Sequence, residues 1–387
     1  MSQTLCRFTP VDSWFFRESR PQGSLGSSEL GSVFPPPVST LLGALRTLIG
    51  DAWHAEHGTN WRQLSELPEL TALIGDSQQL GELSVLGPYL AIGQERLYPA
   101  PATLMVKDDT YFLLDLAPPV RCDLGLVHLP SFPSQVNGLK ELAGSKPAED
   151  AWVTHSGWEA ILQGKAPSKE QVFSADQLFY EESRLGIARD NRRRGVKHGM
   201  LYQTRHLRLH PELSVELVVE GIPPALAKTT QVVRLGGEGR MATLSFEPAS
   251  SLWPSSPLAA AKESHFMLYY LTPSLCADGL PTGIPASFTE AEQDGVKTWQ
   301  GVINDKHCQV LSVACQRPLR EGGWDLANHQ AKPVQSYIAA GTALFCDTPL
   351  SLAELQNLHS SQLGTQTEFG RGQFFIGRLP TTSTFRK

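Results

Sequence analysis

Apolar residues recur at helical spacing in one stretch near the start of the chain. Between residues 41 and 53 they fall on one side of a helical wheel: Leu41, Leu42, Leu45, Leu48, Ile49, Ala52 and Trp53. The proline block at 34–37 cannot enter a helix interior, but Ser39 or Thr40 can cap the helix that follows. The pattern predicts a helix that packs on a sheet, with its N-terminus and Arg46 near a phosphate.

Short strand-like runs dominate the rest of the pattern. They are residues 5–16, 213–220, 232–235, 265–271, 310–314 and 343–346. The run 213–220 alternates like a half-buried strand, and residues 352–359 have a helical pattern. Strands and helices alternate without the regular period of a barrel or a doubly wound sheet. We therefore expect an α+β fold with helices on one face of an antiparallel sheet.

The length of 387 residues allows two domains. We place the division between residues 1–210 and 211–387. Residues 131–176 are polar and interrupted by prolines, so they resemble an insertion with Trp152 and Trp158 in a small satellite core. We expect this insertion to contact other proteins.

Composition narrows the class of protein. Hydrophobic residues make up 41% and charged residues 19%, as in ordinary globular proteins. No signal peptide or membrane span is evident. The six cysteines are scattered without a C-x-x-C pair, which is typical of reduced, mostly buried thiols in a cytoplasmic protein. Asp51, His54 and His57 do not share one helix face, so no metal or other cofactor is expected.

Charge distribution points to a polyanionic partner. The chain is acidic, with 39 Asp and Glu against 33 Lys and Arg, yet residues 184–210 hold eight Lys and Arg against Asp190 alone. The local charge is therefore 8 − 1 = +7. Such a strip is relieved by an anion such as RNA or by exposure to solvent. Its candidate RNA-binding residues are Arg189, Asn191, Arg192, Arg193, Arg194, Lys197, His198 and Tyr202.

Two glycine-rich turns add further candidates, at 234–240 and 364–378. Neither has the glycine spacing of a nucleotide-binding loop. Glycines among Arg and Phe allow the backbone to approach a phosphate, although a tight hairpin is the better explanation for a single such turn. The candidate residues are Gly236, Gly237, Arg240, Phe369, Gly370, Arg371, Gly372 and Arg378.

A series of short motifs occurs in one order along the chain. They are F-x-P-x-D-S-W-F-F-R at 8–17, F-P-P-P-x-S-T-x-x-G-A-L-R at 34–46, L-Y-P-x-P at 97–101, R-L-G-I-A at 184–188, G-x-L-Y at 199–202, L-G-G-E-G-R at 235–240, G-W-D at 323–325 and A-A-G-T-A at 339–343. Together they resemble the third subunit of the Cmr complex, a RAMP protein of type III-B CRISPR systems. The resemblance covers nearly the whole chain.

The resemblance implies two ferredoxin-like (RRM-like) domains with insertions and no catalytic activity. It also implies a subunit that holds the 5′ handle of the guide RNA. Its protein partners would be the large polymerase-like subunit and the first backbone RAMP subunit. The three consecutive arginines 192–194 depart from the more mixed loop expected for the family.

Two other functions remain open on the sequence. RAMP relatives include metal-independent endonucleases, and Lys197, His198 and Tyr202 offer acid–base groups for cleavage of precursor guide RNA. Alternatively, the basic strip meets an acidic protein, and the chain is a purely structural assembly subunit.

Overall fold

The computed structural model describes most of the chain. The described residues are 3–19, 28–61, 64–76, 79–133, 142–190, 192, 195–249, 253–256, 265–276, 283–285, 287–325 and 330–380. They form two compact units, and each unit is assembled from three separate stretches. Unit 1 comprises residues 1–94, 176–250 and 320–335, and unit 2 comprises residues 95–175, 251–319 and 336–387. Neither unit ends at residue 210, because strands from both sides of that position share a sheet in unit 1.

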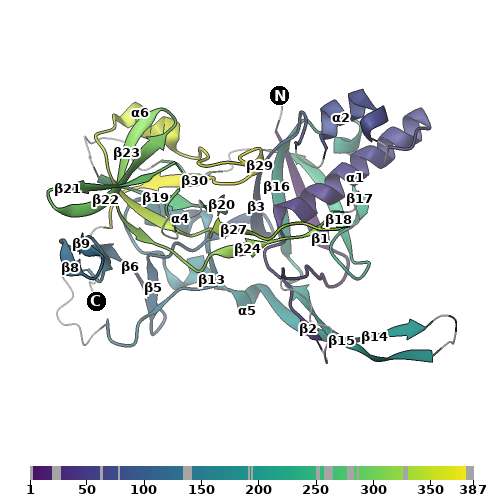
Figure 1. Cartoon of the computed structure of the whole chain (residues 1–387), viewed down its shortest axis with the longest axis horizontal. Helices are drawn as coiled ribbons and strands as arrows, with labels where there is room; N and C mark the ends of the chain where they lie inside the picture. The colour runs from purple at the N-terminus through teal and green to yellow at the C-terminus, as the bar shows by residue number, and fades with distance from the viewer. Residues whose placement is uncertain are drawn as a thin grey trace. The chain divides into compact units, whose positions relative to one another are not determined.

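An antiparallel sheet forms the body of unit 1. Its strands, in spatial order, are β3 (Ser84–Ile92), β16 (Leu213–Glu220), β1 (Thr4–Pro10), β18 (Met241–Pro248) and β17 (Gln231–Arg234). The helices of this unit include α1 (Val38–His57), η1 (Leu64–Glu66), α2 (Pro68–Ile74) and η3 (Leu226–Lys228). Helix α1 packs next to β17 (Figure 1).

Helix α1 buries the predicted apolar stripe, but its N-terminus lacks the predicted side-chain cap. Leu41, Leu45 and Ile49 are buried as expected. The helix begins at Val38 after Pro37, with no side-chain cap, so the prediction that Ser39 or Thr40 caps it is wrong. Both residues lie inside the first turn, where proline at the preceding position has already set the extended backbone that enters the helix.

Strand β16 is buried on both faces, so the prediction of a half-buried strand is wrong. It is a central strand between β1 and β3, and even Glu216 is only 3% exposed. Arg7, directly across from Glu216 on β1, forms an ion pair with it at 3.0 Å. The charged position in the alternating pattern therefore has a charged partner inside the fold instead of solvent.

A long hairpin extends from the sheet of unit 1. Its strands are β14 (Phe179–Asp190) and β15 (Gly195–Leu209), and the short β2 (Ser28–Leu30) adds to β15 in parallel. Figure 1 shows this hairpin as a two-stranded arm. Most of the basic strip at 184–210 therefore lies on the two strands of this hairpin. The small pair β25 (Trp324–Asp325) and β26 (Gln330–Ala331) also belongs to this unit.

Unit 2 contains a mostly antiparallel sheet that carries its main core, with β22 and β9 paired in parallel. The spatial order is β30 (Phe374–Gly377), β19 (His265–Tyr270), β28 (Ala343–Asp347), β23 (Lys306–Ala314), β22 (Val296–Ile303), β9 (Gly125–Val127) and β8 (Val120–Cys122), with β21 (Thr289–Gln293) also paired to β22. Phe266, Leu268, Phe288, Leu344 and Ile376 belong to its hydrophobic core.

Smaller pieces complete unit 2. Short strands are β4 (Glu95–Pro99), β5 (Leu104–Lys107), β6 (Thr110–Leu113), β7 (Asp115–Leu116), β10 (Pro130–Ser131), β11 (Lys146–Pro147), β12 (Ala151–Thr154), β13 (Val172–Ser174), β20 (Ser274–Leu275) and β29 (Phe369–Gly370). Helical segments are α4 (His155–Leu162), η2 (Lys169–Gln171) and α6 (Leu352–Leu358). Three elements lie at the limits of the two units: α5 (Ala175–Leu178), β24 (Leu319–Glu321) and β27 (Gln335–Ile338).

The two tryptophans of the predicted insertion lie in the body of unit 2. Trp152 is on β12, which pairs with β4. Trp158 on α4 is fully buried and packs edge-on against Tyr98, Tyr269 and Phe375. The prediction of a small satellite core at these tryptophans is therefore wrong, because β12 and α4 form part of the main aromatic core.

The broad fold class agrees with the sequence. The chain is α+β, rich in strands and poor in helices, and the predicted strands 232–235, 265–271, 310–314 and 343–346 and the helix 352–359 are confirmed within a few residues. All six cysteines are free thiols, but only Cys6, Cys308 and Cys346 are buried. In the described part of the chain, no helix is long and apolar enough to cross a membrane.

Candidate nucleic-acid interface

The β14–β15 hairpin brings two of the sequence motifs together. Gly186 of R-L-G-I-A lies directly across from Tyr202 of G-x-L-Y. A Cβ on Gly186 would lie 2.3 Å from Cζ of Tyr202, so the phenol ring covers the glycine backbone. Tyr202 is half-buried by this contact. Whether its ring also stacks on a base stays a prediction.

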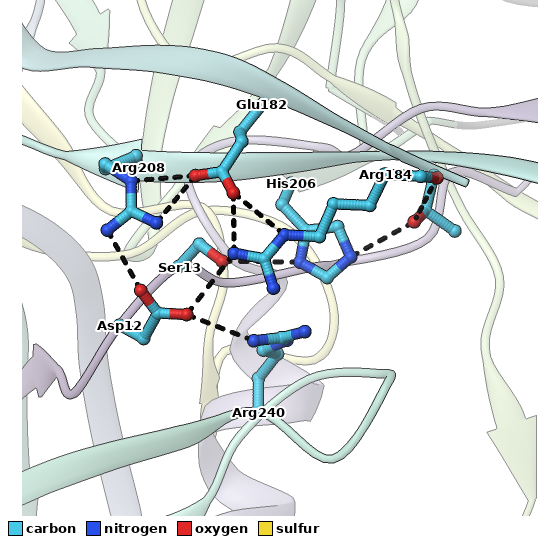
Figure 2. Close-up of polar contacts among 8 residues, drawn as sticks. Asp12, Ser13, Glu182, Arg184, His206, Arg208 and Arg240 are labelled. Atoms are coloured by element: carbon cyan, nitrogen blue, oxygen red, sulfur yellow. Dashed lines mark hydrogen bonds and ion pairs between the residues drawn. The ribbon is translucent and has the colours of Figure 1, made fainter. Parts of the chain in front are cut away.

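The arginines at the base of the hairpin are neutralised within unit 1. Arg184 and Arg208 each contact the same two carboxylates, Asp12 and Glu182 (Figure 2). The four side chains thus form a closed ion-pair ring in which positive and negative groups alternate. The contacts to Glu182 measure 2.7 and 2.6 Å, and those to Asp12 measure 3.3 and 2.9 Å. Arg240 adds a third guanidinium to Asp12 at 3.2 Å. A hydrogen bond from the backbone of Ser13, together with those from Arg208 and Arg184, keeps the pKa of Asp12 below its usual value.

Arg205 is neutralised by a different pair of acids. Residues alternate between the two faces of a strand, so Arg205 lies on the opposite face from Arg184 and Arg208. It contacts Glu29 at 2.6 Å and Glu181 at 3.1 Å. Three of the eight cations of the basic strip, Arg184, Arg205 and Arg208, are therefore held in ion pairs within unit 1.

The remaining excess charge belongs to the outer half of the hairpin. Residues 189–197 hold five cations and one acid, or 5 − 1 = +4. Arg192 is exposed. Asn191, Arg193 and Arg194 lie outside the described residues, and so do the side chains of Arg189, Lys197 and His198. The contacts predicted for these residues stay predictions.

His206 lies under the ion-pair ring and is unsuited to proton transfer. It is 1% exposed, lies between Ser13 and Thr204 at 3.4 and 3.1 Å, and stacks on Phe15. Burial, followed by the positive charges of Arg240 and Arg184, lowers the pKa of His206 to about 4. The imidazole is therefore neutral near pH 7.

The first glycine-rich turn approaches its own chain. Gly236 has φ +85°, and a Cβ there would lie 2.5 Å from the carbonyl oxygen of Phe15. The amide of Gly237 donates to the same oxygen at 2.8 Å. These glycines thus allow close packing on Phe15, and their approach to RNA stays a prediction. The turn also positions Arg240 beside Asp12.

The predicted residues of helix α1 remain near the surface. Ser39 is exposed, and Thr40 and Arg46 are half-buried. Arg46 donates to the backbone carbonyl of Asp76 at 2.6 Å. The structure does not bring these residues into the hairpin cluster, and their contact with a guide RNA is untested.

The C-terminal glycine-rich loop is largely interior to unit 2. Arg371 is 4% exposed, with its guanidinium carbon 4.3 Å from the centre of the Tyr337 ring. Gly370 is buried, and Phe369 and Arg378 are half-buried. Gly372 has φ +69°, and a Cβ there would lie 2.0 Å from the carbonyl oxygen of Leu363. Part of the loop therefore packs within unit 2, and the predicted contact of the loop with RNA stays a prediction.

Sequence reasoning missed the acids that organise the cluster. Asp12 lies in the D-S-W-F-F motif, but 172 residues separate it from Arg184. The only signal was the excess of arginines, which requires compensating charge somewhere in the fold. Among the described residues, no group of three or more His, Cys, Asp or Glu side chains is arranged to hold a metal ion.

Comparison with known proteins gives a family. The model of the family described as "CRISPR-associated protein (Cas_Cmr3)" matches residues 6–379. No curated protein matches the sequence.

Solved structures give weaker likenesses. One is a chain of the type III-B Cmr-beta complex bound to cognate target RNA and AMPPnP, with 18% identity and a TM-score of 0.44 over 89% of this chain and 86% of that one. Another is a chain of the Csm3–Csm4 subcomplex of the type III-A interference complex, with 9% identity and a TM-score of 0.35 over 90% and 94%. TM-scores below 0.5 carry no structural conclusion, so we rely on the family match.

The environment of His206 predicts a pH dependence of stability. An unfolded histidine titrates near pH 6.5, so between about pH 6.5 and 4 the unfolded chain binds a proton that the folded chain does not. His206 therefore lowers the free energy of unfolding as pH falls through this window. We expect His206→Gln to flatten the decline of Tm between pH 6.5 and 4.5. The exposed His210 is the control, because His210→Gln should retain the wild-type slope. Equal slopes in all three proteins would contradict the assignment.

The packing of Gly372 predicts a stability effect that a matched glycine lacks. Gly295 has nearly the same backbone, φ +78°, but no atom lies within 4 Å of the position of a Cβ. Gly295→Ala should cost about 1–2 kcal/mol for the left-handed backbone alone. Gly372→Ala should cost clearly more, because the new methyl overlaps the carbonyl of Leu363. Urea unfolding of both variants measures the difference, and equal losses would show that the close approach is unimportant.

Proposed function

The chain belongs to the Cas_Cmr3 family of CRISPR-associated proteins, and from this premise we propose that it is a non-catalytic, RNA-binding subunit of a type III-B effector complex. Its RNA ligand is the 5′ handle of the guide RNA. Its protein partners are the large polymerase-like subunit and the first backbone RAMP subunit, with which it assembles in the cytoplasm. Family membership itself makes it a subunit of a type III CRISPR effector complex. We further propose that its two units descend from ferredoxin-like domains with insertions.

The observation that carries RNA binding is the charge on the outer half of the hairpin. The whole chain has a net charge of −6, and the arginines at the hairpin base are paired with acids. Residues 189–197, which include the end of β14 and the start of β15, have a net charge of +4 in the sequence. A single-stranded RNA supplies a regular series of phosphates for such a focused patch, and its unpaired bases are free to stack on aromatic rings.

The positions of His206 and Tyr202 in the hairpin support a non-catalytic role. Cleavage of RNA without a metal needs a group that removes the proton of a 2′-OH and another that protonates the leaving oxygen. His206 is buried and unprotonated near neutral pH, and the ring of Tyr202 lies against Gly186. Endonuclease activity through Lys197 and His198 is the alternative, and it is tested directly below.

The outer arginines predict the salt dependence of RNA binding. Replacement of Arg192, Arg193 and Arg194 by Gln removes three charges. Each lost phosphate contact lowers the slope of log affinity against log salt by about 0.7 for a single strand, so the slope should fall by up to about 2. A fluorescence anisotropy titration with a labelled single-stranded repeat RNA at several salt concentrations measures it. The matched control replaces the exposed Lys146, Lys165 and Lys228 by Gln.

The control variant should keep both the affinity and the slope of the wild type. Equal changes in both triple variants would mean that only net charge matters. An unchanged slope in the arginine variant would favour the structural alternative, in which the hairpin meets an acidic protein.

The non-catalytic assignment predicts the fate of precursor RNA. Incubation of the purified chain with repeat-containing RNA and a chelator should leave the RNA intact on a denaturing gel. A product that disappears in His198→Ala but persists in His210→Ala would instead establish the endonuclease function.

A further inference from the structure

The β14–β15 hairpin has two faces with different chemistry. Antiparallel pairing places Arg184, Tyr202 and Arg208 on one face. The other face bears the exposed apolar residues Leu185 and Ile187 at 74% and 46% exposure. Arg205 lies on this second face together with its acidic partners. We refer to the face that carries Tyr202 as the Tyr202 face.

The charge of the ion cluster on the Tyr202 face is not balanced. Asp12 and Glu182 are offset by Arg184 and Arg208, which leaves Arg240 as surplus, or 3 − 2 = +1. On the opposite face, Arg205 meets two acids, which gives 1 − 2 = −1. An anion is therefore favoured on the Tyr202 face and disfavoured on the other.

The carboxylate of Asp12 occupies a place that also suits a phosphate. It accepts contacts from three guanidinium groups, and its side chain is 47% exposed. The same planar forks match the oxygens of a phosphate. Arg240 uses one terminal nitrogen, while its buried Nε has no hydrogen-bond partner among the described residues. Arg240 is thus the least satisfied of the three guanidiniums.

We propose that Arg184, Arg208 and Arg240 form a phosphate-binding site on the Tyr202 face, in which Asp12 holds the place of a phosphate group. This inference rests on the proposed RNA-binding function and assigns its ligand to one face. A single strand that runs along this face passes Tyr202 and reaches the three arginines.

Four variants of the full chain test the site in two matched pairs. Arg240→Gln removes the surplus cation, and Arg205→Gln removes a cation from the opposite face. Asp12→Asn removes the competing carboxylate but keeps an oxygen for the amide of Ser13, and Glu29→Gln makes the same charge change on the opposite face. Asp12 and Glu29 have nearly equal exposure, at 47% and 46%. Binding of labelled single-stranded RNA is measured by anisotropy at several salt concentrations, with thermal unfolding as the check on folding.

We expect Arg240→Gln to weaken RNA binding about tenfold, as for the loss of one charge-assisted hydrogen bond, and to lower the salt slope by about 0.7. Arg205→Gln should leave both values unchanged. Asp12→Asn should strengthen binding more than Glu29→Gln. Equal effects within each pair would overturn the site, because they would show a response to net charge alone. Weaker binding by Asp12→Asn at unchanged Tm would also overturn it, because Asp12 would then be only a clamp on the hairpin.

Binding of inorganic phosphate tests the site independently of the proposed RNA-binding function. If the wild-type chain binds no RNA at low salt, the proposed function fails, and phosphate alone then tests the site. A bound anion raises Tm by mass action. A rise in the wild type that is absent in Arg240→Gln supports the site, whereas the same response in both proteins overturns it.

Discussion

Antiparallel pairing of β14 with β15 fixes which charges of unit 1 meet. In such a ladder each residue lies on a face set by its register, so Arg184 and Arg208 share one face and Arg205 takes the other. A slip of one residue between the two strands would turn the side chains of one strand to the other face. Arg184 and Arg208 would then lie on opposite faces, and Asp12 would lose contact with one of them. The ion-pair ring and the distribution of net charge therefore both depend on this register.

These ion pairs contribute little to the free energy of unfolding, and their main effect is on where net charge lies in unit 1. Each is partly exposed, and exposed pairs are worth about 0.2–1 kcal/mol. Their effect is to remove self-repulsion at the base of the hairpin, where four cations meet four acids: Arg184, Arg205, Arg208 and Arg240 against Asp12, Glu29, Glu181 and Glu182. Because the base is neutral as a whole, the excess positive charge is confined to the outer half of the hairpin and to an asymmetry between its faces.

Local patterns in the sequence predicted several of the elements, but not their environments. The stripe of Leu41, Leu45 and Ile49 predicted helix α1 because helical periodicity needs only neighbouring residues. The burial of Glu216 depends on Arg7, more than 200 residues away, so no local pattern could reveal it. The same holds for the hairpin cations: the sequence showed their excess, but not that Asp12 would reach three arginines. The sequence did not show what the glycine-rich turns contact, because a glycine allows any group to approach closely. In the structure, the groups that approach are the backbone carbonyls of Phe15 and Leu363.

The motifs that carried the family resemblance contact one another in the folded chain. Within unit 1, Asp12 and Phe15 of the first motif meet Arg240 and Gly236 of L-G-G-E-G-R. Within unit 2, the motif at 97–101 meets A-A-G-T-A, because a Cβ on Gly341 would lie 2.4 Å from the carbonyl oxygen of Ala100. Each of these four motifs thus supplies one side of a tertiary contact. A series of individually weak motifs in a fixed order is informative for this physical reason, since the fold requires them as pairs.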